Sequence, residues 1–326
     1  MATKKFNKPR GGIAYTIEEA FTEYLEEKEA NNLAYDTLRN YKHSYKAFLE
    51  YHEIDEETTP ISEITLQQFY KWINHMKQNE VRHTSINHYL RDWRTFLNWC
   101  YKHEKIQEAI KVKEIEVQEE LPKMYEDDEL AAMLVKPREG DSFSDWRSWA
   151  IISLIYATGL RAATVCHLCW EDISFEREEI VIERQKNKKA GVLPLTPALA
   201  STLKDYRRVY ASASGEKPEP TDWLFPSTTG GQFTVSGLTQ SIGRYCKHLG
   251  IDGHGAHSIR HNFARDMIRN GGGEYRLQRY LQHSSIQMSQ HYVKLFSSDL
   301  KKNAEEFSPL DNAKKKASRT SKFSKK

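Results

Sequence analysis

The chain has 326 residues, of which 39% are hydrophobic and 29% are charged. This length is enough for two domains that each bury a core, and the composition excludes an intrinsically disordered chain. No apolar run is long enough to span a bilayer, and no hydrophobic segment follows the basic N-terminus as it does in a signal peptide, so we expect a cytoplasmic protein with no membrane partner.

Charge is distributed unevenly along the chain. Residues 1–13 form a basic tail of charge +4 and residues 311–326 form another of +6, so the net charge of +3 leaves −7 on the body between them. Overall basicity therefore does not indicate nucleic-acid binding, and a phosphate-binding surface on the body has to be a local feature. The tails are typical of salt-sensitive attraction to DNA and equally of solubilising ends.

The four cysteines form no recognisable disulfide framework. Cys166 and Cys169 make a C-x-x-C pair, but no second pair of ligands completes a zinc site. We therefore interpret them as two small residues on one helix face, and we predict no metal.

Four amphipathic helices are predicted between residues 14 and 108. The first follows a capping box formed by Thr16 and Glu19, and the others begin near Asp36, after Thr65 and near Thr84. Helices of this length pack into a compact all-helical domain. Basic residues on their polar faces are candidates for contact with a DNA backbone: Arg39, Lys42, Lys46, Arg91 and Arg94. The same pattern is also typical of a solvated helix face.

Residues 109–122 alternate in charge, and we interpret them as a linker to a second domain at 123–310. That domain opens with helices predicted near 127–134 and 146–158. Gly159 ends the second of these and places Arg161 at the start of the next helix.

The remainder of the second domain combines a small sheet with more helices. Segments 179–184 and 191–195 have strand character and flank a lysine-rich turn, which predicts a β-hairpin. Helices are predicted after Pro197, from about Ser236 and from Ala256 onwards, with a break at residues 271–273. The sequence therefore predicts a mainly α protein, with a small antiparallel sheet in a mixed α+β second domain.

The stretch from His257 to Tyr292 concentrates side chains that can handle phosphate. His257 and Arg260 are about one helical turn apart, so both can face one target. A tyrosine that attacks a phosphodiester needs positive donors on the non-bridging oxygens, and the planar guanidinium suits that task. Histidine can exchange a proton near neutral pH, and a lysine can protonate the leaving oxygen. Neither a metal nor a nucleotide is required.

Other chemistry fits parts of this stretch. His254, His257 and His261 have the spacing of a zinc cluster, but the motif contains neither a fourth ligand nor a glutamate for a catalytic water. On chemistry alone, three tyrosines are candidate nucleophiles: Tyr275, Tyr280 and Tyr292.

The order of these motifs resembles the signature of the tyrosine recombinases, the phage integrase family. The matching segments are ATGLR, RQKNKKAGVLPL, HSIRH, LQHSSI and QMSQHY, and the likeness extends through the second domain. The four-helix first domain resembles the SAM-like core-binding domain of the same family. By this resemblance, the catalytic residues are Arg161, Lys186, His257, Arg260, His283 and Tyr292.

The resemblance implies that the tyrosine attacks DNA, forms a 3′-phosphotyrosyl link and releases a 5′-hydroxyl that attacks the link on a partner strand. It implies that the two arginines bind the phosphate and that Lys186, or its neighbours Lys188 and Lys189, protonates the leaving oxygen. His257 is then an acid or base, and His283 donates a hydrogen bond to the phosphate.

The resemblance also implies partners: double-stranded DNA clamped between the two domains, and a homotetramer on two DNA sites that can be a monomer in solution. No cofactor is implied. Two other functions remain open, a non-cleaving DNA-binding accessory protein of the same fold and a type IB-like topoisomerase.

Two positions depart from the family pattern. The family often has an acidic residue three positions after the first arginine, where this chain has Thr164, so we expect Arg161 to be supported from elsewhere. The glycine that usually precedes the second histidine is Gln282, a change that can alter the turn while leaving His283 in place.

Overall fold

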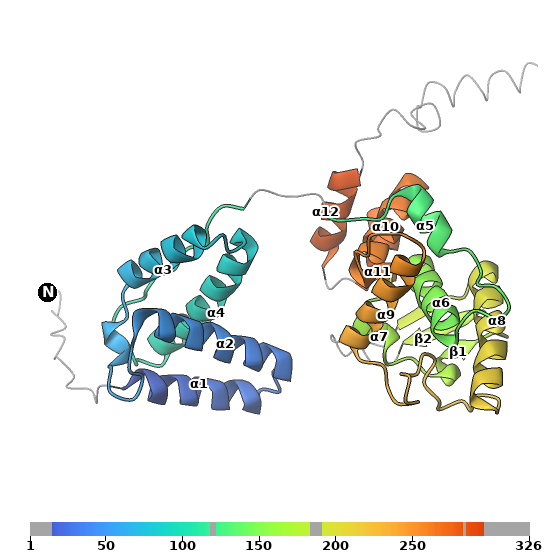
Figure 1. Ribbon diagram of the computed structural model, residues 1–326. Helices are drawn as coiled ribbons and strands as arrows, with labels where there is room; N and C mark the ends of the chain where they lie inside the picture. Colours follow the sequence, from blue (N-terminus) through green and yellow to red (C-terminus); the bar gives the residue numbers. More distant parts are fainter. Residues whose placement is uncertain (1–14, 118–121, 183–190, 283–284, 297–326) are drawn as a thin grey trace, which may run out of the picture. The chain divides into compact units, whose positions relative to one another are not determined.

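A computed structural model describes residues 15–117, 122–182, 191–282 and 285–296. The chain divides into two compact units, residues 1–120 and 121–326, and each is described by itself (Figure 1). Both units are mainly helical, as the sequence predicts. Lys186, His283 and the two basic tails lie outside the described residues.

The first unit contains the four predicted helices: α1 (Ile17–Ala30), α2 (Tyr35–His52), α3 (Leu66–Gln78) and α4 (His83–Lys102), with a short 3-10 turn, η1 (Ile61–Glu63). The predicted capping box is present at the start of α1. The Thr16 hydroxyl accepts a hydrogen bond from the Glu19 N–H at 3.2 Å, and the Glu19 carboxylate accepts one from the Thr16 N–H at 2.9 Å. Two backbone donors that a helix start leaves without intrahelical partners are satisfied in this way.

Aromatic rings fill the core of the first unit. Phe48 and Trp93 are almost fully buried, with ring centroids 4.4 Å apart, and the Trp93 indole donates to the Ser44 carbonyl at 3.0 Å. The core also includes Val112. Asn87 pairs with both backbone groups of Ile115 at 2.8 Å, so part of the stretch predicted as a linker packs on this unit.

The second unit is built around α6 (Phe143–Thr158), which is buried on nearly every side. It packs against α8 (Pro197–Ser214), α9 (Val235–His248) and α10 (Ala256–Arg269). The remaining helices are α5 (Asp127–Met133), α7 (Ala162–Val165), the 3-10 turn η2 (Trp170–Asp172), α11 (Glu274–Leu281) and α12 (Ile286–Phe296). Helix α6 starts three residues earlier than predicted because the Ser142 hydroxyl caps it, accepting from the Asp145 N–H at 3.2 Å.

The sheet of the second unit is antiparallel, in the order β1 (Ile173–Ser174), β2 (Glu179–Ile182) and β3 (Gly191–Pro194). β2 and β3 form the predicted hairpin, with Glu179 opposite Pro194 and Ile182 opposite Gly191. β1 is not predicted, because two residues are too few to show a period-two pattern. The segment that joins β2 to β3 contains Lys186 and lies outside the described residues.

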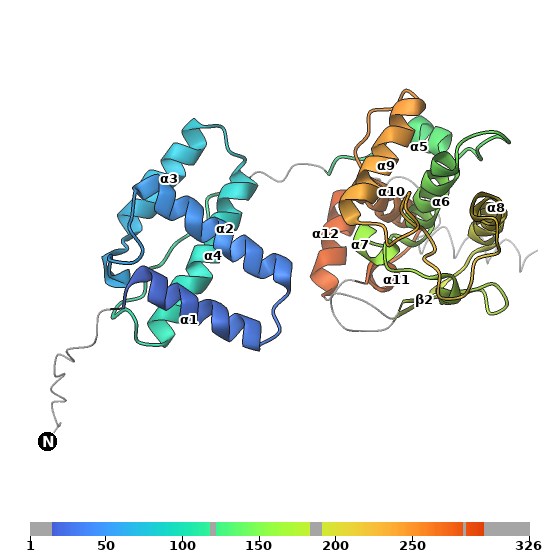
Figure 2. The ribbon, with the colours of Figure 1, turned by 60° about the horizontal axis from the view of Figure 1, so that its bottom comes forward.

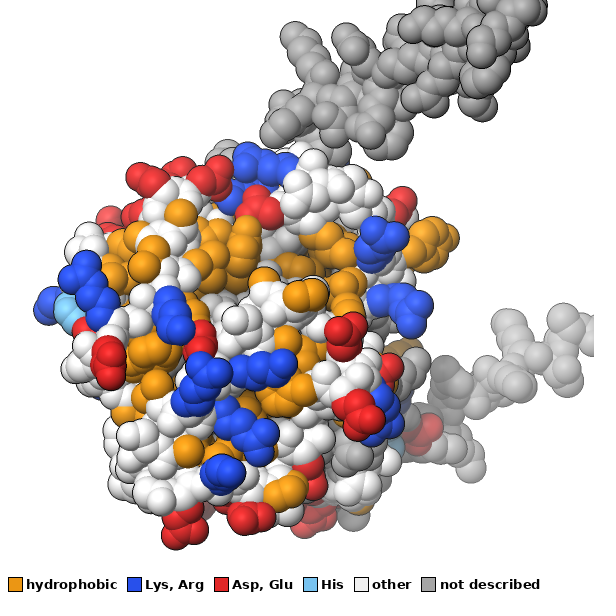
Figure 3. Space-filling model, turned by 90° about the vertical axis from the view of Figure 1, so that its right-hand side faces the viewer, with side chains coloured by type: hydrophobic (Ala, Val, Ile, Leu, Met, Phe, Trp, Pro, Cys, Tyr) orange, Lys and Arg blue, Asp and Glu red, His pale blue; other side chains and the backbone are white. Residues whose placement is uncertain are grey.

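Helices α10, α11 and α12 lie next to one another in both ribbon views (Figures 1 and 2). One face of the second unit carries Lys and Arg side chains among Asp, Glu and apolar side chains (Figure 3). That face is therefore not a surface of one charge sign. Within the described ranges, the structure contains no helix that is both long and apolar enough to cross a membrane.

Candidate active site

Helix α6 ends at Gly159, as predicted, and this end determines where Arg161 lies. Gly159 has a φ of +67°, and a Cβ atom there would lie 2.5 Å from the Phe263 ring and 2.7 Å from the Leu281 side chain. Only glycine fits such a left-handed, tightly packed position without strain. The chain then turns so that Arg161 becomes the N-cap residue of α7.

Arg260 is the most buried charged residue of the site, with 3% of its surface exposed. Its guanidinium donates to the Gly159 carbonyl at the end of α6 and, at 2.8 Å, to the Leu281 carbonyl at the end of α11. Carbonyls at helix C-termini carry partial negative charge, which suits a cation. Burial, and then the charge of Arg161, lowers the pKa of Arg260 to about 10, so Arg260 stays charged at neutral pH.

Arg161 lies close enough for its charge to affect His257, Arg260 and Tyr292. No carboxylate of the described residues forms an ion pair with Arg161, and Thr164 supplies none. Within the described part of the unit, the positive charge of Arg161 is therefore available to an anion.

Tyr292 projects from α12 and is 9% exposed, in an apolar cluster with Phe263 and Leu277. Its hydroxyl lies 2.8 Å from Nδ1 of His261. Burial raises the pKa of Tyr292, although the charges of Arg260 and Arg161 oppose the increase. The hydroxyl is therefore protonated at neutral pH, and it must lose its proton to become a strong nucleophile.

Two histidines lie side by side on α10. The ring centroids of His257 and His261 are 4.3 Å apart, with the planes at 78°. His257 keeps an exposed surface, yet partial burial and then the charges of Arg260 and Arg161 lower its pKa. For His261, burial and then His257 and Arg260 lower the pKa to about 4. Both rings are therefore neutral at neutral pH.

From the sequence, we considered His261 only as a zinc ligand and did not predict its contact with Tyr292. The available signal was its position four residues after His257, which puts both on one face of α10. Among the residues that the structure describes, no group of three or more His, Cys, Asp or Glu side chains is placed to hold a metal ion.

Gln282 replaces the usual glycine, but the turn keeps the conformation that glycine favours. Its φ is +52°, in the left-handed region, and it ends α11 directly before His283. A non-glycine residue in this region costs about 1 kcal/mol. The residue before Gln282 is Leu281, and its carbonyl accepts a hydrogen bond from Arg260. This bond holds the end of α11 in place.

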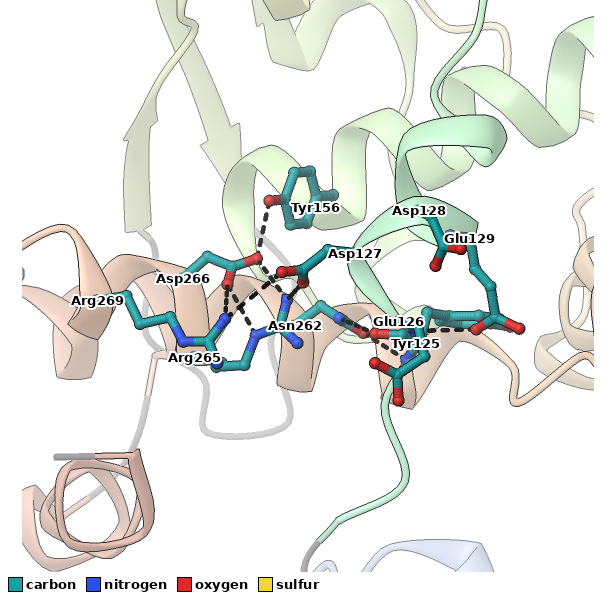
Figure 4. A network of polar contacts seen from close by, with 10 residues as sticks. All are labelled: Tyr125, Glu126, Asp127, Asp128, Glu129, Tyr156, Asn262, Arg265, Asp266 and Arg269. Atoms are coloured by element: carbon teal, nitrogen blue, oxygen red, sulfur yellow. Dashed lines mark hydrogen bonds and ion pairs between the residues drawn. The ribbon is translucent and has the colours of Figure 1, made fainter. Parts of the chain in front are cut away.

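A polar network fixes α10 from the side of α5 (Figure 4). Asn262 accepts from the Tyr125 N–H at 3.0 Å and donates to the Tyr125 carbonyl at 2.7 Å. Arg265 donates to Asp266 at 2.8 Å and also to Asp127 of α5. The helix that carries His257, Arg260 and His261 is thus bonded to the first residues of its own unit, which limits its movement.

The predicted DNA-contacting residues of the first unit are mostly paired with acids. Arg91 and Arg94 share Glu114, at 3.1 and 2.9 Å. Two other ion pairs lie along α2, Arg39 with Asp36 at 3.2 Å and Lys46 with Glu50 at 3.6 Å, and Lys42 is exposed. Contact of these residues with DNA stays a prediction.

The chain is similar to several known proteins. Tyrosine recombinase XerC of Thermodesulfovibrio yellowstonii is 26% identical over 262 residues, which cover 79% of this chain and 85% of the relative. The Tn1549 transposon integrase in complex with circular intermediate DNA has a TM-score of 0.67 at 18% identity, covering 85% of this chain and 94% of that one. A lambda integrase tetramer bound to a Holliday junction has a TM-score of 0.65 at 16% identity, covering 86% and 77%. These two structures share the fold of this chain.

Two family descriptions match along the sequence. The N-terminal SAM-like domain of phage integrases matches residues 19–105, within the first unit. The phage integrase family itself matches residues 123–298, a span that includes Arg161, His257, Arg260 and Tyr292. Since that match alone extends over more than half of the sequence, the chain belongs to the phage integrase family, the tyrosine recombinases that cut and rejoin DNA.

Proposed function

We propose that this protein is a site-specific recombinase in which Tyr292 cuts DNA and carries the 3′-phosphate as a phosphotyrosine. The observation that supports this proposal best is the convergence of the Tyr292 hydroxyl, the His257–His261 pair and two arginine charges. A phosphodiester bound by the arginines would lie next to the Tyr292 hydroxyl, which contacts His261 of α10. Tyr275, by contrast, is 76% exposed.

Each side chain then has a role in one displacement. The bond between phosphorus and the Tyr292 oxygen forms while the bond to the 5′-oxygen breaks, and negative charge increases on the non-bridging oxygens. Arg161 and Arg260 stabilise that charge, and the two helix ends that hold Arg260 keep it in position before DNA arrives. By resemblance to the family, Lys186 protonates the 5′-oxygen, His283 donates to the phosphate and His257 is an acid or base.

We propose that the partner of the reaction is double-stranded DNA, and that the protein acts as a homotetramer on two DNA sites in the cytoplasm. The lambda integrase tetramer on a Holliday junction supports an assembly of this kind through its likeness in fold. Arg39, Lys42, Lys46, Arg91 and Arg94 are the proposed backbone contacts of the first unit. Strand exchange between sites requires four cleavages, so a tetramer supplies one tyrosine for each.

The test is covalent trapping on a nicked suicide substrate that carries the protein's recombination site, recovered from source DNA by binding selection. Wild-type protein should form an adduct that survives denaturing electrophoresis, and Tyr292→Phe should form none while still binding DNA. Tyr275→Phe is the matched control and should retain the adduct. An adduct from Tyr292→Phe would disprove the assigned nucleophile, and its absence from wild type would favour a non-cleaving accessory protein.

A further inference from the structure

His261 is the partner of the Tyr292 hydroxyl, and the family resemblance gave it no role. Its Nδ1 atom lies 2.8 Å from the phenol oxygen, within the 2.6–3.2 Å reach that a general base needs. The two residues are 31 positions apart and come from different helices, so the contact depends on the packing of α12 against α10. It joins the nucleophilic atom itself to a group that can carry a proton.

The protonation states of the two partners fit a transfer in one direction. His261 is neutral at neutral pH because burial, followed by His257 and Arg260, lowers its pKa. A neutral imidazole has one ring nitrogen that accepts a hydrogen bond. Tyr292 is protonated, since burial raises its pKa. With the proton of His261 on Nε2, Nδ1 therefore accepts the proton that Tyr292 must lose.

Bound DNA would make His261 a stronger base. Among the described residues, His257 and Arg260 of α10 act on His261 by their charge, and the Tyr292 hydroxyl contacts its ring. Arg161, before α7, acts on His257, Arg260 and Tyr292, and His291 of α12 lies beside Tyr292. The positive members of this set disfavour protonation of His261. A phosphodiester between the two arginines carries a negative charge that offsets theirs. The base thus gains strength only when the substrate is present.

We propose that His261 is the general base of cleavage, a role that rests on Tyr292 being the nucleophile. As the Tyr292 oxygen bonds to phosphorus, its proton passes to Nδ1 of His261, and the 5′-oxygen leaves with a proton from the general acid. In rejoining, the 5′-hydroxyl displaces Tyr292, and His261 returns the proton to the phenol oxygen. No oxidant, reductant or metal takes part in either direction.

The first experiment replaces His261 by Asn, Gln and Ala in the full-length protein and measures single-turnover cleavage of the suicide substrate. Asn can place an amide oxygen near the position of Nδ1, so it can still accept the Tyr292 hydrogen bond, but it cannot take the proton. We expect His261→Asn to bind DNA like wild type and to cleave about 10²-fold more slowly, the lower end of what general base catalysis contributes. His248→Asn, at an exposed position whose partner Asp145 lies at the opposite end of α6 from Gly159, is the control and should cleave normally.

A second experiment separates proton transfer from positioning. A ring-fluorinated tyrosine with a more acidic phenol is incorporated at position 292, with and without His261→Asn. Because a more acidic nucleophile depends less on a base, the deficit caused by His261→Asn should shrink at least about tenfold. A side chain that only orients Tyr292 would leave the deficit unchanged.

The proposal is overturned if any His261 variant that binds DNA as tightly as wild type also cleaves at the wild-type rate. An unchanged deficit with the fluorinated tyrosine overturns it as well, since His261 would then act on position alone. Tyr292→Phe in the same assay keeps the two proposals apart. Loss of the adduct in Tyr292→Phe, combined with normal cleavage by His261→Asn, would retain the nucleophile and reject the base.

Discussion

Arg260 shows how one side chain connects the fold to the site. Its guanidinium bonds to the carbonyls of Gly159 and Leu281, which end two different helices, so the cation is held before any phosphate binds. Pre-organised donors act on a transition state without the cost of reorganisation. Burial of the two histidines lowers the pKa of His257 and of His261, and the positive charge of Arg260 adds to both decreases. Arg260 therefore favours the neutral form of its neighbours as well as holding its own charge in position.

The lowered pKa values of His257 and His261 predict acid lability of the second unit. In the unfolded chain, these histidines take up protons near their ordinary pKa of about 6.5, whereas in the folded protein His261 resists protonation down to a pKa of about 4. The unfolded state then binds more protons, so stability falls as pH decreases through this window, by at most about 3 kcal/mol for His261. Urea unfolding at pH 7 and pH 5, assigned to α10 by amide exchange, measures the effect.

His261→Asn should lose less stability between pH 7 and pH 5 than wild type, because Asn does not titrate. Parallel losses in wild type and His261→Asn would show that protonation of His261 is not coupled to unfolding.

At the scale of elements, the end of α6 is sensitive to the addition of a single methyl group. Gly159→Ala combines a left-handed backbone with a Cβ atom 2.5 Å from the Phe263 ring. We expect a loss of about 2–4 kcal/mol from backbone strain and overpacking together. Cleavage should fall as well, since the Gly159 carbonyl accepts from Arg260. Urea unfolding and the adduct assay measure the two effects.

Gly215→Ala is the matched control for that substitution. Gly215 ends α8 with a φ of +84°, but an added Cβ meets nothing within 4 Å. Only the strain of the left-handed backbone remains, so we expect the free energy of unfolding to fall by about 1 kcal/mol and cleavage to stay normal. Equal losses for the two variants would show that packing around Gly159 contributes nothing.

The sequence predicts the helices and strands of this fold better than the tertiary contacts between them. The helices follow from apolar stripes and capping residues such as Thr16, and the hairpin follows from two β-branched segments, all of which are local signals. Four of the proposed catalytic residues likewise lie in segments that match the family motifs: Arg161, His257, Arg260 and Tyr292. The contact of Tyr292 with His261 joins two helices through tertiary packing, and no local pattern encodes it. Strand β1 is not predicted for a different reason: its two residues are too few to show a local pattern.

At the scale of the whole molecule, binding to DNA depends on local charge, because the net charge is only +3. Glu114 pairs with Arg91 and Arg94, so it competes with DNA phosphates for both. Glu114→Gln should free the two arginines, tighten DNA binding several-fold and steepen the dependence of log affinity on log salt by roughly one to two. Fluorescence anisotropy across a salt series measures both.

Glu80→Gln removes the same charge from the same unit at an exposed residue that pairs with neither arginine. It should change the salt dependence much less. If the two variants behave alike, Arg91 and Arg94 do not contact DNA, and the binding face of the first unit lies elsewhere.

The most direct measurement of the central claim is the identity of the residue that carries DNA after cleavage. Adduct trapped on the suicide substrate is digested with nuclease and protease, and the peptide that retains a nucleotide is sequenced by mass spectrometry. We predict attachment at Tyr292, within the α12 segment, on a 3′-phosphate. Attachment at Tyr275, at Tyr280 or on a 5′-phosphate would contradict the proposed chemistry.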